Sequence, residues 1–160
     1  MEGTMVKGSI DSGGSISVTS RSRYVRMCPI CLAAWTMIAT PDGQIAVTNL
    51  TVGMPVWTMD QAGRRVAATV TKVGSIQAPI GHTVVHIVLA DGRQVWVSPG
   101  HPTIDGRHVG ELGVGDQLDG STVVSADRVA YVGKTFDLLP SGATGDYWAD
   151  GVALHSSLAP

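Results

Sequence analysis

Side chains capable of nucleophilic and acid–base chemistry lie in four short, widely separated segments. They are Cys31 at the start of Cys-Leu-Ala-Ala-Trp-Thr, Ser98 and His101 in Ser-Pro-Gly-His, Asp137 in Thr-Phe-Asp-Leu, and His155 after Val-Ala-Leu. A thiol, a hydroxyl, a carboxylate and two imidazoles together supply a nucleophile, an orienting group and carriers of protons. This set of residue types predicts attack on a peptide bond of the protein's own backbone.

The elements that must position these residues are short and rich in β-branched residues. Strand-like runs separated by turn dipeptides lie at residues 56–59, 66–73, 83–89, 94–97, 122–125 and 147–149. Asp91-Gly92, between two of these runs, is the strongest hairpin signal in the chain. Helical turns are expected only near residues 47–50 and 109–112, and each leads into a similar glycine-containing segment. The pattern predicts an all-β domain with an internal duplication.

Composition narrows the class of protein. The chain has 160 residues, 44% of them hydrophobic, and a formal net charge of −2, which suits one compact domain and disfavours nucleic-acid binding. No run approaches the roughly 18 to 20 apolar residues of a membrane span, and residues 1–30 lack the apolar middle of a signal peptide. Residues 1–30 are rich in glycine and serine without a core-forming period, so we expect a flexible flank, either native or added for expression.

The four segments resemble the motifs of the hedgehog/intein (Hint) family, and within it those of bacterial intein-like domains. The match covers residues 31–156 and leaves 157–160 as a tail. Residues 31–43 resemble the opening motif with Cys31 as nucleophile, and residues 98–101 resemble its Thr-x-x-His motif with serine in place of threonine. Residues 135–138 and 149–155 resemble the later motifs. The resemblance implies a Hint fold, which is a β-rich, pseudo-two-fold, horseshoe-like domain.

The resemblance also implies a role for each residue in an N-to-S acyl shift. For Cys31 to attack the carbonyl of Ile30, its sulfur must become a thiolate and the leaving amide nitrogen must be protonated. His101 is the expected source of that proton, and Ser98 is expected to orient the scissile amide. Asp137 would hold a proton for the departing amine or help to deprotonate Cys31. An amide is more stable than a thioester, so the fold must strain this bond and stabilise the developing charge.

Departures from the family pattern limit the expected reaction. Inteins finish by cyclising an asparagine after the last histidine, but here Ser156 follows His155. Gly145 stands where many inteins have a second helper histidine. We therefore expect N-terminal cleavage, with release of the thioester by water or another nucleophile, and no full splicing. The roles of Ser156 and Ser157 stay open, and nothing resembles the sterol-binding extension of hedgehog proteins.

Cys28 adds a second hypothesis, because Cys28-Pro-Ile-Cys31 is a C-x-x-C motif. A disulfide between Cys28 and Cys31 would keep the chain uncleaved until it is reduced. The same two cysteines with His82 and His86 form an alternative zinc ligand set, because residues four apart in a strand point to one side. A lone C-x-x-C motif is a weak signal of zinc.

The sequence thus predicts a monomeric, single-turnover self-processing domain that acts on its own N-terminal flank and needs no cofactor. Neither nucleic acid nor a membrane is an expected partner. The resemblance implies a setting inside a larger bacterial protein, often secreted or at the cell surface, although we recognise no targeting signal in the chain. The alternative is a catalytically silent Hint module with a structural or binding role, with zinc at Cys28 and Cys31.

Overall fold

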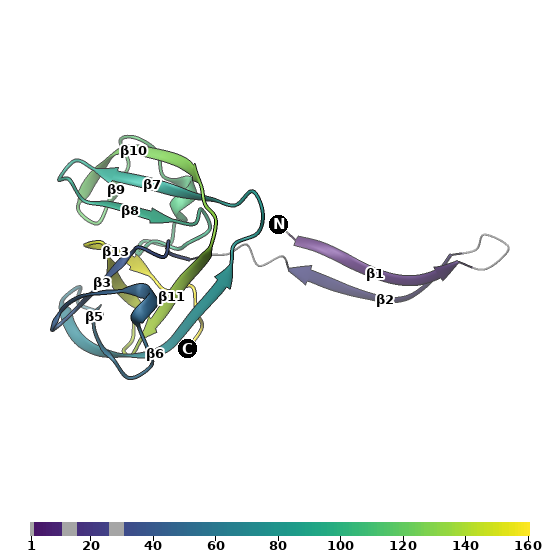
Figure 1. Ribbon diagram of the computed structural model, residues 1–160, viewed down its shortest axis with the longest axis horizontal. Coiled ribbons are helices and arrows are strands. Elements are labelled where there is room, and N and C mark those ends of the chain that lie inside the picture. Colours follow the sequence, from purple (N-terminus) through teal and green to yellow (C-terminus); the bar gives the residue numbers. More distant parts are fainter. Residues whose placement is uncertain (1, 11–15, 26–30) are drawn as a thin grey trace.

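The structure is a computed structural model that describes residues 2–10, 16–25 and 31–160 (Figure 1). Residues 31–160 form a β-rich domain. Its elements are β3 (Met37–Thr40), β4 (Gly43–Ala46), η1 (Val47–Asn49), β5 (Pro55–Met59), β6 (Arg65–Gln77), β7 (Thr83–Leu89), β8 (Gln94–Val97), η2 (Val109–Glu111), β9 (Gln117–Leu118), β10 (Ser121–Ala130), β11 (Lys134–Pro140), β12 (Asp146–Ala149) and β13 (Val152–His155). Both helical segments are single 3-10 turns.

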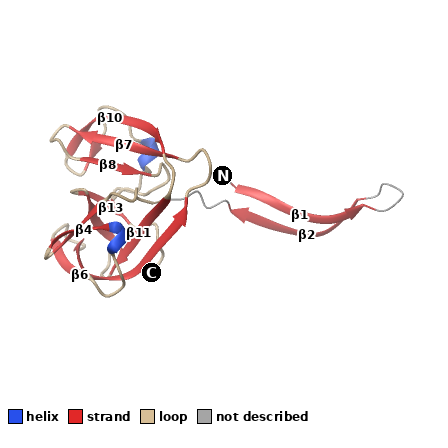
Figure 2. Ribbon diagram, viewed as in Figure 1, coloured by secondary structure: helices blue, strands red, loops and turns tan. Residues whose placement is uncertain are grey.

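The strands of this domain form three antiparallel sheets. Their strand orders are β8-β7-β10-β9, β11-β6-β5 and β13-β12-β3-β4. Asp91 and Gly92 turn the chain between β7 and β8, where His86 lies opposite Trp96, so the predicted hairpin is confirmed. Figure 2 shows strands throughout the domain and short helical turns between them, which confirms the all-β prediction. No helix in the described part of the chain is long and apolar enough to cross a membrane.

A repeated pattern of hydrogen bonds follows the two helical turns. The Gly53 amide donates to the Val70 carbonyl at 2.8 Å, and the Val70 amide donates back to the residue after Gly53. The Gly115 amide donates to the Val123 carbonyl at 2.9 Å, and the Val123 amide donates back to the residue after Gly115. Both glycines have a positive φ, 93° and 97°, which glycine adopts without steric cost. The predicted duplication is therefore present as two pseudo-symmetric halves.

Apolar side chains at matched positions of the two halves fill the core. The pairs, each side chain at most 6% exposed, are Val47 and Val109, Leu50 and Leu112, Val56 and Leu118, and Val70 and Val123. Burying a side chain of this size contributes about 1.5–3 kcal/mol to folding. The matched core holds the two halves together and so fixes the strands that carry the candidate site.

The described parts of the N-terminal flank form a hairpin that the sequence did not predict. β1 (Glu2–Ile10) and β2 (Ile16–Val25) pair antiparallel, with Glu2 opposite Val25, and they make a two-stranded sheet of their own. Backbone pairing of this kind needs no apolar face, which is why a search for core-forming periods does not find it. The domain boundary at Cys31 stays a prediction.

Candidate functional site

The backbone that begins at Cys31 is held between two strands from distant parts of the chain. Leu32 exchanges both backbone hydrogen bonds with Phe136 of β11, at 2.7 and 3.0 Å. On the other side, the Ser98 amide donates to the Cys31 carbonyl at 3.0 Å, and Leu32 bridges to Val97 of β8. Cys31 itself is buried, at 8% exposure. The predicted nucleophile therefore has a fixed position inside the domain.

Ser98 and His101 lie in a tight turn that follows β8. The His101 amide donates to the Ser98 carbonyl at 3.0 Å, and both residues are fully buried. The η2 turn supports this segment, because the Val109 amide donates to the His101 carbonyl at 2.9 Å and the Gly110 amide donates to the Pro99 carbonyl at 2.7 Å. The Ser-x-x-His spacing thus places Ser98, whose amide donates to the Cys31 carbonyl, and His101 in one buried turn.

Asp137 is a buried carboxylate on β11 that accepts four hydrogen bonds. Its Oδ1 accepts from the Tyr147 hydroxyl at 2.7 Å and from the Leu138 amide at 2.8 Å. Its Oδ2 accepts from the Ser157 amide at 2.7 Å and from the Ser157 hydroxyl at 2.5 Å. A carboxylate has about four lone-pair positions, so these donors occupy its accepting capacity. The C-terminal segment is thereby fixed to the residue that the sequence placed in the site.

Tyr147, on β12, joins Asp137 to His101 and was not predicted as a site residue. Its hydroxyl lies 3.2 Å from the His101 Nε2 as well as 2.7 Å from Asp137. Burial raises the pKa of Tyr147 well above its ordinary value, and the negative charge of Asp137, its hydrogen bond to the phenol and a negative charge at Cys31 add to the effect. No spacing in the sequence marks Tyr147, because its role depends on which strands surround β12.

His82 contacts Ser98 and is a second polar residue that sequence reasoning did not place in the catalytic set. Its Nε2 lies 3.0 Å from the Ser98 Oγ. Burial lowers the pKa of His82, so the neutral imidazole is favoured at this position. His82 stands just before β7 and is partly exposed, whereas Ser98 is fully buried. The pair links the interior of the site to the solvent side of the domain.

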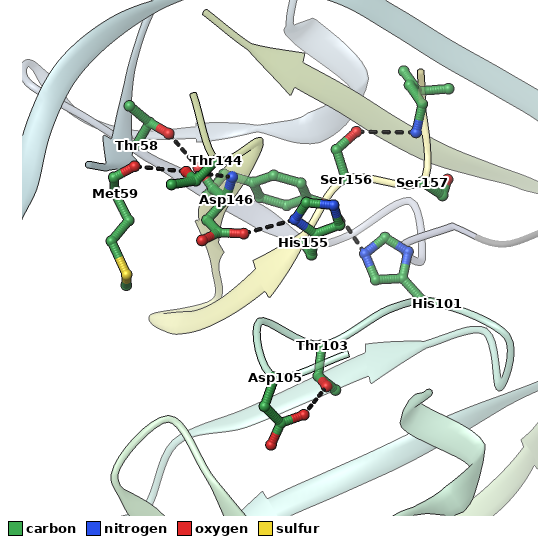
Figure 3. Close-up of polar contacts among 12 residues, drawn as sticks. Thr58, Met59, His101, Thr103, Asp105, Thr144, Asp146, His155, Ser156 and Ser157 are labelled. Carbon is green, nitrogen blue, oxygen red and sulfur yellow. Dashed lines mark hydrogen bonds and ion pairs between the residues drawn. The ribbon is translucent and has the colours of Figure 1, made fainter. Parts of the chain in front are cut away.

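His155 forms a pair with Asp146 at the end of β13. The His155 Nδ1 lies 2.8 Å from the Asp146 Oδ1, and Figure 3 shows the two side chains turned toward each other. A Cβ at Gly145 would lie 3.3 Å from the His155 Cε1, so the glycine leaves room for this ring. The backbone amide of His155 donates to the Pro102 carbonyl, next to His101. The backbone of His155 is therefore hydrogen-bonded to the segment that carries His101, while its ring pairs with Asp146.

The two histidines of the alternative zinc ligand set, His82 and His86, contact other side chains in the structure. The His86 ring stacks on Trp96 with centroids 4.1 Å apart, and its Nε2 lies 2.8 Å from Gln94. His82 is engaged with Ser98. Among the described residues, no three His, Cys, Asp or Glu side chains are grouped so as to hold a metal. Cys28, which both the zinc set and the disulfide hypothesis require, lies outside the described residues.

The structure thus brings together most of the predicted set from four distant segments. The Cys31 carbonyl accepts a hydrogen bond from the Ser98 amide. The Tyr147 hydroxyl is within hydrogen-bonding distance of both His101 and Asp137. His155 joins Asp146 in a neighbouring pair. The arrangement offers a thiol, a buried imidazole and a buried carboxylate in a region from which water is largely excluded, where electrostatic interactions are strong.

Comparison with solved structures identifies the class of fold. Comparisons with protein-family models and with curated proteins find no match. A bacterial intein-like domain from Clostridium thermocellum is similar with a TM-score of 0.69 at 21% identity, covering 79% of this chain and 98% of that one. A DnaB intein from Synechocystis sp. PCC 6803 has a TM-score of 0.69 at 19% identity, covering 80% and 99%. The zinc-bound splicing domain of the Msm DnaB1 intein has a TM-score of 0.62 at 20% identity, covering 78% and 98%.

The chain has the Hint fold, the β-rich and pseudo-symmetric architecture of inteins. Within that fold it is similar to a bacterial intein-like domain over almost the whole length of that domain, as the sequence motifs predicted.

Proposed function

We propose that residues 31–156 form a self-processing domain that cleaves or transfers the polypeptide preceding Cys31. One observation carries the proposal: the backbone of Cys31 is fixed beside a buried chain of carboxylate, phenol and imidazole formed by Asp137, Tyr147 and His101. The carbonyl that would be attacked belongs to Ile30, the preceding residue, which lies outside the described residues. A buried site favours this chemistry because fixed dipoles replace water around the developing charge.

The proposed first step is an N-to-S acyl shift. The Cys31 sulfur attacks the Ile30 carbonyl carbon, a C–S bond forms, and the bond from that carbon to the Cys31 nitrogen breaks. The thiol proton passes to His101 and from there to the nitrogen, which leaves as an amine. The products are a thioester of Ile30 on Cys31 and a free amino group on Cys31. No further reagent is consumed.

Two contacts support the orientation of the scissile amide. The Ser98 amide holds the Cys31 carbonyl, which restricts rotation of the backbone on one side of the reacting bond. The Ser98 hydroxyl is itself directed by His82 at 3.0 Å and is proposed to hydrogen-bond the amide being cleaved. Holding reacting groups in one geometry lowers the entropic part of the barrier.

Release of the thioester would follow without asparagine cyclisation. Ser156 takes the place of the terminal asparagine and is buried, with its amide donating to the Gly145 carbonyl at 2.9 Å. Water or an added nucleophile is the proposed acceptor. The Ser157 hydroxyl, which donates to Asp137, is a proposed acceptor within the chain. Its oxygen would bond to the acyl carbon, the bond from that carbon to the Cys31 sulfur would break, and the hydroxyl proton would pass through Asp137 to the departing sulfur. The β-branched Ile30 slows hydrolysis by crowding the thioester.

A redox gate at Cys28 and Cys31 is proposed to precede this chemistry. Oxidation of the two thiols to a disulfide by a thiol oxidant would remove the nucleophile, and a dithiol reductant would restore it. Purified chain incubated with and without reductant should release the fragment faster in reductant. Cys28→Ser should remove that difference, while equal rates for the unsubstituted chain in the two conditions would overturn the gate alone.

Reaction with hydroxylamine tests the thioester. The chain, purified under reducing conditions, should release a fragment ending at Ile30 faster in hydroxylamine than in buffer, because hydroxylamine attacks thioesters and leaves ordinary amides largely intact. His101→Ala should slow release by about a hundredfold or more, because acid–base catalysis typically contributes about 10²- to 10⁴-fold. A silent module would instead yield no fragment, and bound zinc in the purified protein would favour the alternative function.

A further inference from the structure

The Tyr147 hydroxyl has one proton and two hydrogen-bond partners in the site. It lies 2.7 Å from the Asp137 Oδ1 and 3.2 Å from the His101 Nε2. A phenol donates one hydrogen bond, whereas its oxygen accepts others. The direction of each bond therefore depends on which partner receives the single proton.

The surroundings of Asp137 decide this direction. The other groups bonded to its carboxylate are the Leu138 amide, the Ser157 amide and the Ser157 hydroxyl, all of which donate. The Tyr147 hydroxyl is a fourth donor to this carboxylate, so its single proton points at the Asp137 Oδ1. Burial and the Asp137 charge also raise the pKa of Tyr147, which keeps the phenol protonated. Toward His101 the Tyr147 oxygen is then an acceptor, and the His101 Nε2 must carry a hydrogen.

We propose that Tyr147 is a positioning residue that holds neutral His101 as the Nε2–H tautomer and leaves Nδ1 as the proton-accepting nitrogen of the ring. The hydrogen bond made by one ring nitrogen sets which nitrogen carries the proton. This inference rests on the proposed function, in which His101 transfers the proton. It adds the ring atom to that step: Nδ1 of His101 accepts the thiol proton and gives it to the Cys31 nitrogen.

The proposed positioning role of Tyr147 depends on its hydroxyl, whereas a packing role would depend on its ring. Tyr147 is fully buried in the main core, so removing its ring would disturb the fold. Tyr147→Phe keeps the ring and removes only the oxygen. If the oxygen sets the tautomer, this variant changes the ionisation behaviour of His101 while its fold stays intact. A packing role would leave the His101 ring unchanged.

Nitrogen-15 NMR of the histidine rings tests the proposal directly. The full chain with Cys31→Ala, which should remain uncleaved, gives the tautomer of His101 in a stable sample, and His101→Ala assigns its signals. We expect a protonated Nε2 and an unprotonated Nδ1, and a clear loss of the Nε2–H population with Tyr147→Phe. A protonated Nδ1 in the Cys31→Ala chain, or the same tautomer with and without the Tyr147 hydroxyl, would overturn the proposal.

A kinetic measurement completes the test. In the chain with Cys31 intact, Tyr147→Phe should slow fragment release about tenfold, the effect expected from losing one hydrogen bond, and shift the pH at which the rate reaches half its maximum. An unchanged rate and pH profile would contradict the positioning role. The NMR result in the Cys31→Ala chain does not depend on cleavage, so failure of the tautomer proposal can be told from failure of the proposed function.

Discussion

Gly110 lies against Pro99 so closely that a Cβ on the glycine would be 2.8 Å from the Pro99 Cβ and 3.0 Å from its carbonyl oxygen. The Gly110 amide also donates to that carbonyl at 2.7 Å. Pro99 belongs to the turn that carries Ser98 and His101. We therefore expect Gly110→Ala to displace this turn, to lower the free energy of unfolding by about 1–3 kcal/mol, and to slow fragment release.

Gly113→Ala is the matched control for this substitution, because a Cβ at Gly113 would meet no atom within 4 Å. Urea denaturation and fragment release should be close to those of the unsubstituted chain. Equal behaviour of the two variants at positions 110 and 113 would show that contact with Pro99 does not support the turn.

Replacing Asp137 with asparagine should damage both stability and activity. Asp137→Asn exchanges one accepting oxygen for an amide donor, which would face the hydroxyl of Tyr147 or the donors of Ser157. A buried polar group left unpaired costs about 1–3 kcal/mol, which urea denaturation would measure. Asp127→Asn, where the carboxylate accepts from Ser125 in an exposed position, should change stability by less than about 0.5 kcal/mol. Similar losses at both positions would refute the buried network.

The local parts of the fold could be predicted from the sequence. The runs at 83–89 and 94–97 coincide with β7 and β8, because strand patterning and the Asp91-Gly92 turn are local properties. β6 extends to Gln77, beyond the predicted end at 73, because residues 74–77 pair with β11. That pairing joins segments about 60 residues apart, so nothing in the local pattern indicates it.

The sequence predicts only those residues of the candidate site that belong to local motifs. Cys31, Ser98, His101 and Asp137 occur in motifs with short fixed spacing, and a motif is visible in a sequence. Tyr147 reaches His101 and Asp137 only after β12 is packed beside their segments. The four-residue spacing of His82 and His86 indicates an alternative metal set, whereas in the structure His82 precedes β7 and contacts Ser98. Contacts of this kind depend on tertiary structure.

The lowered pKa of His82 should make the free energy of unfolding smaller in mild acid than at neutral pH. Its pKa in the folded chain is lowered by burial from the ordinary value of 6.5, so below pH 6.5 the unfolded chain binds more protons than the folded one. The stability contribution is complete above pH 6.5 and is lost as the pH falls through the lowered pKa. Urea denaturation at pH 7.5 and pH 5, which lie about one unit or more on either side of 6.5, should measure this loss. The free energy of unfolding should fall less between these two pH values in His82→Gln than in the unsubstituted chain.

Direct titration of the His82 ring by NMR provides the control for this prediction. The midpoint should lie below 6.5 in the folded protein. A midpoint at or above that value, or an unchanged pH dependence of stability in His82→Gln, would contradict the effect of burial on this residue.

His155→Ala should affect N-terminal cleavage far less than His101→Ala. The His155 side chain is 43% exposed and its ring is paired with Asp146, so loss of the pair should cost at most about 1 kcal/mol of stability. Fragment release measured by mass spectrometry should therefore remain close to that of the unsubstituted chain. A loss as large as that of His101→Ala, in a variant that still unfolds cooperatively, would place His155 in the cleavage step.

Intact-mass spectrometry of the reduced chain and of its Cys31→Ala variant, each incubated in hydroxylamine, tests the thioester proposal most directly. The unsubstituted chain should yield an N-terminal fragment ending at Ile30 as a hydroxamate, together with a second fragment that begins at Cys31. Cys31→Ala should stay intact. Release of the same fragment from Cys31→Ala, or an intact unsubstituted chain after prolonged incubation, would contradict acyl transfer to the Cys31 sulfur.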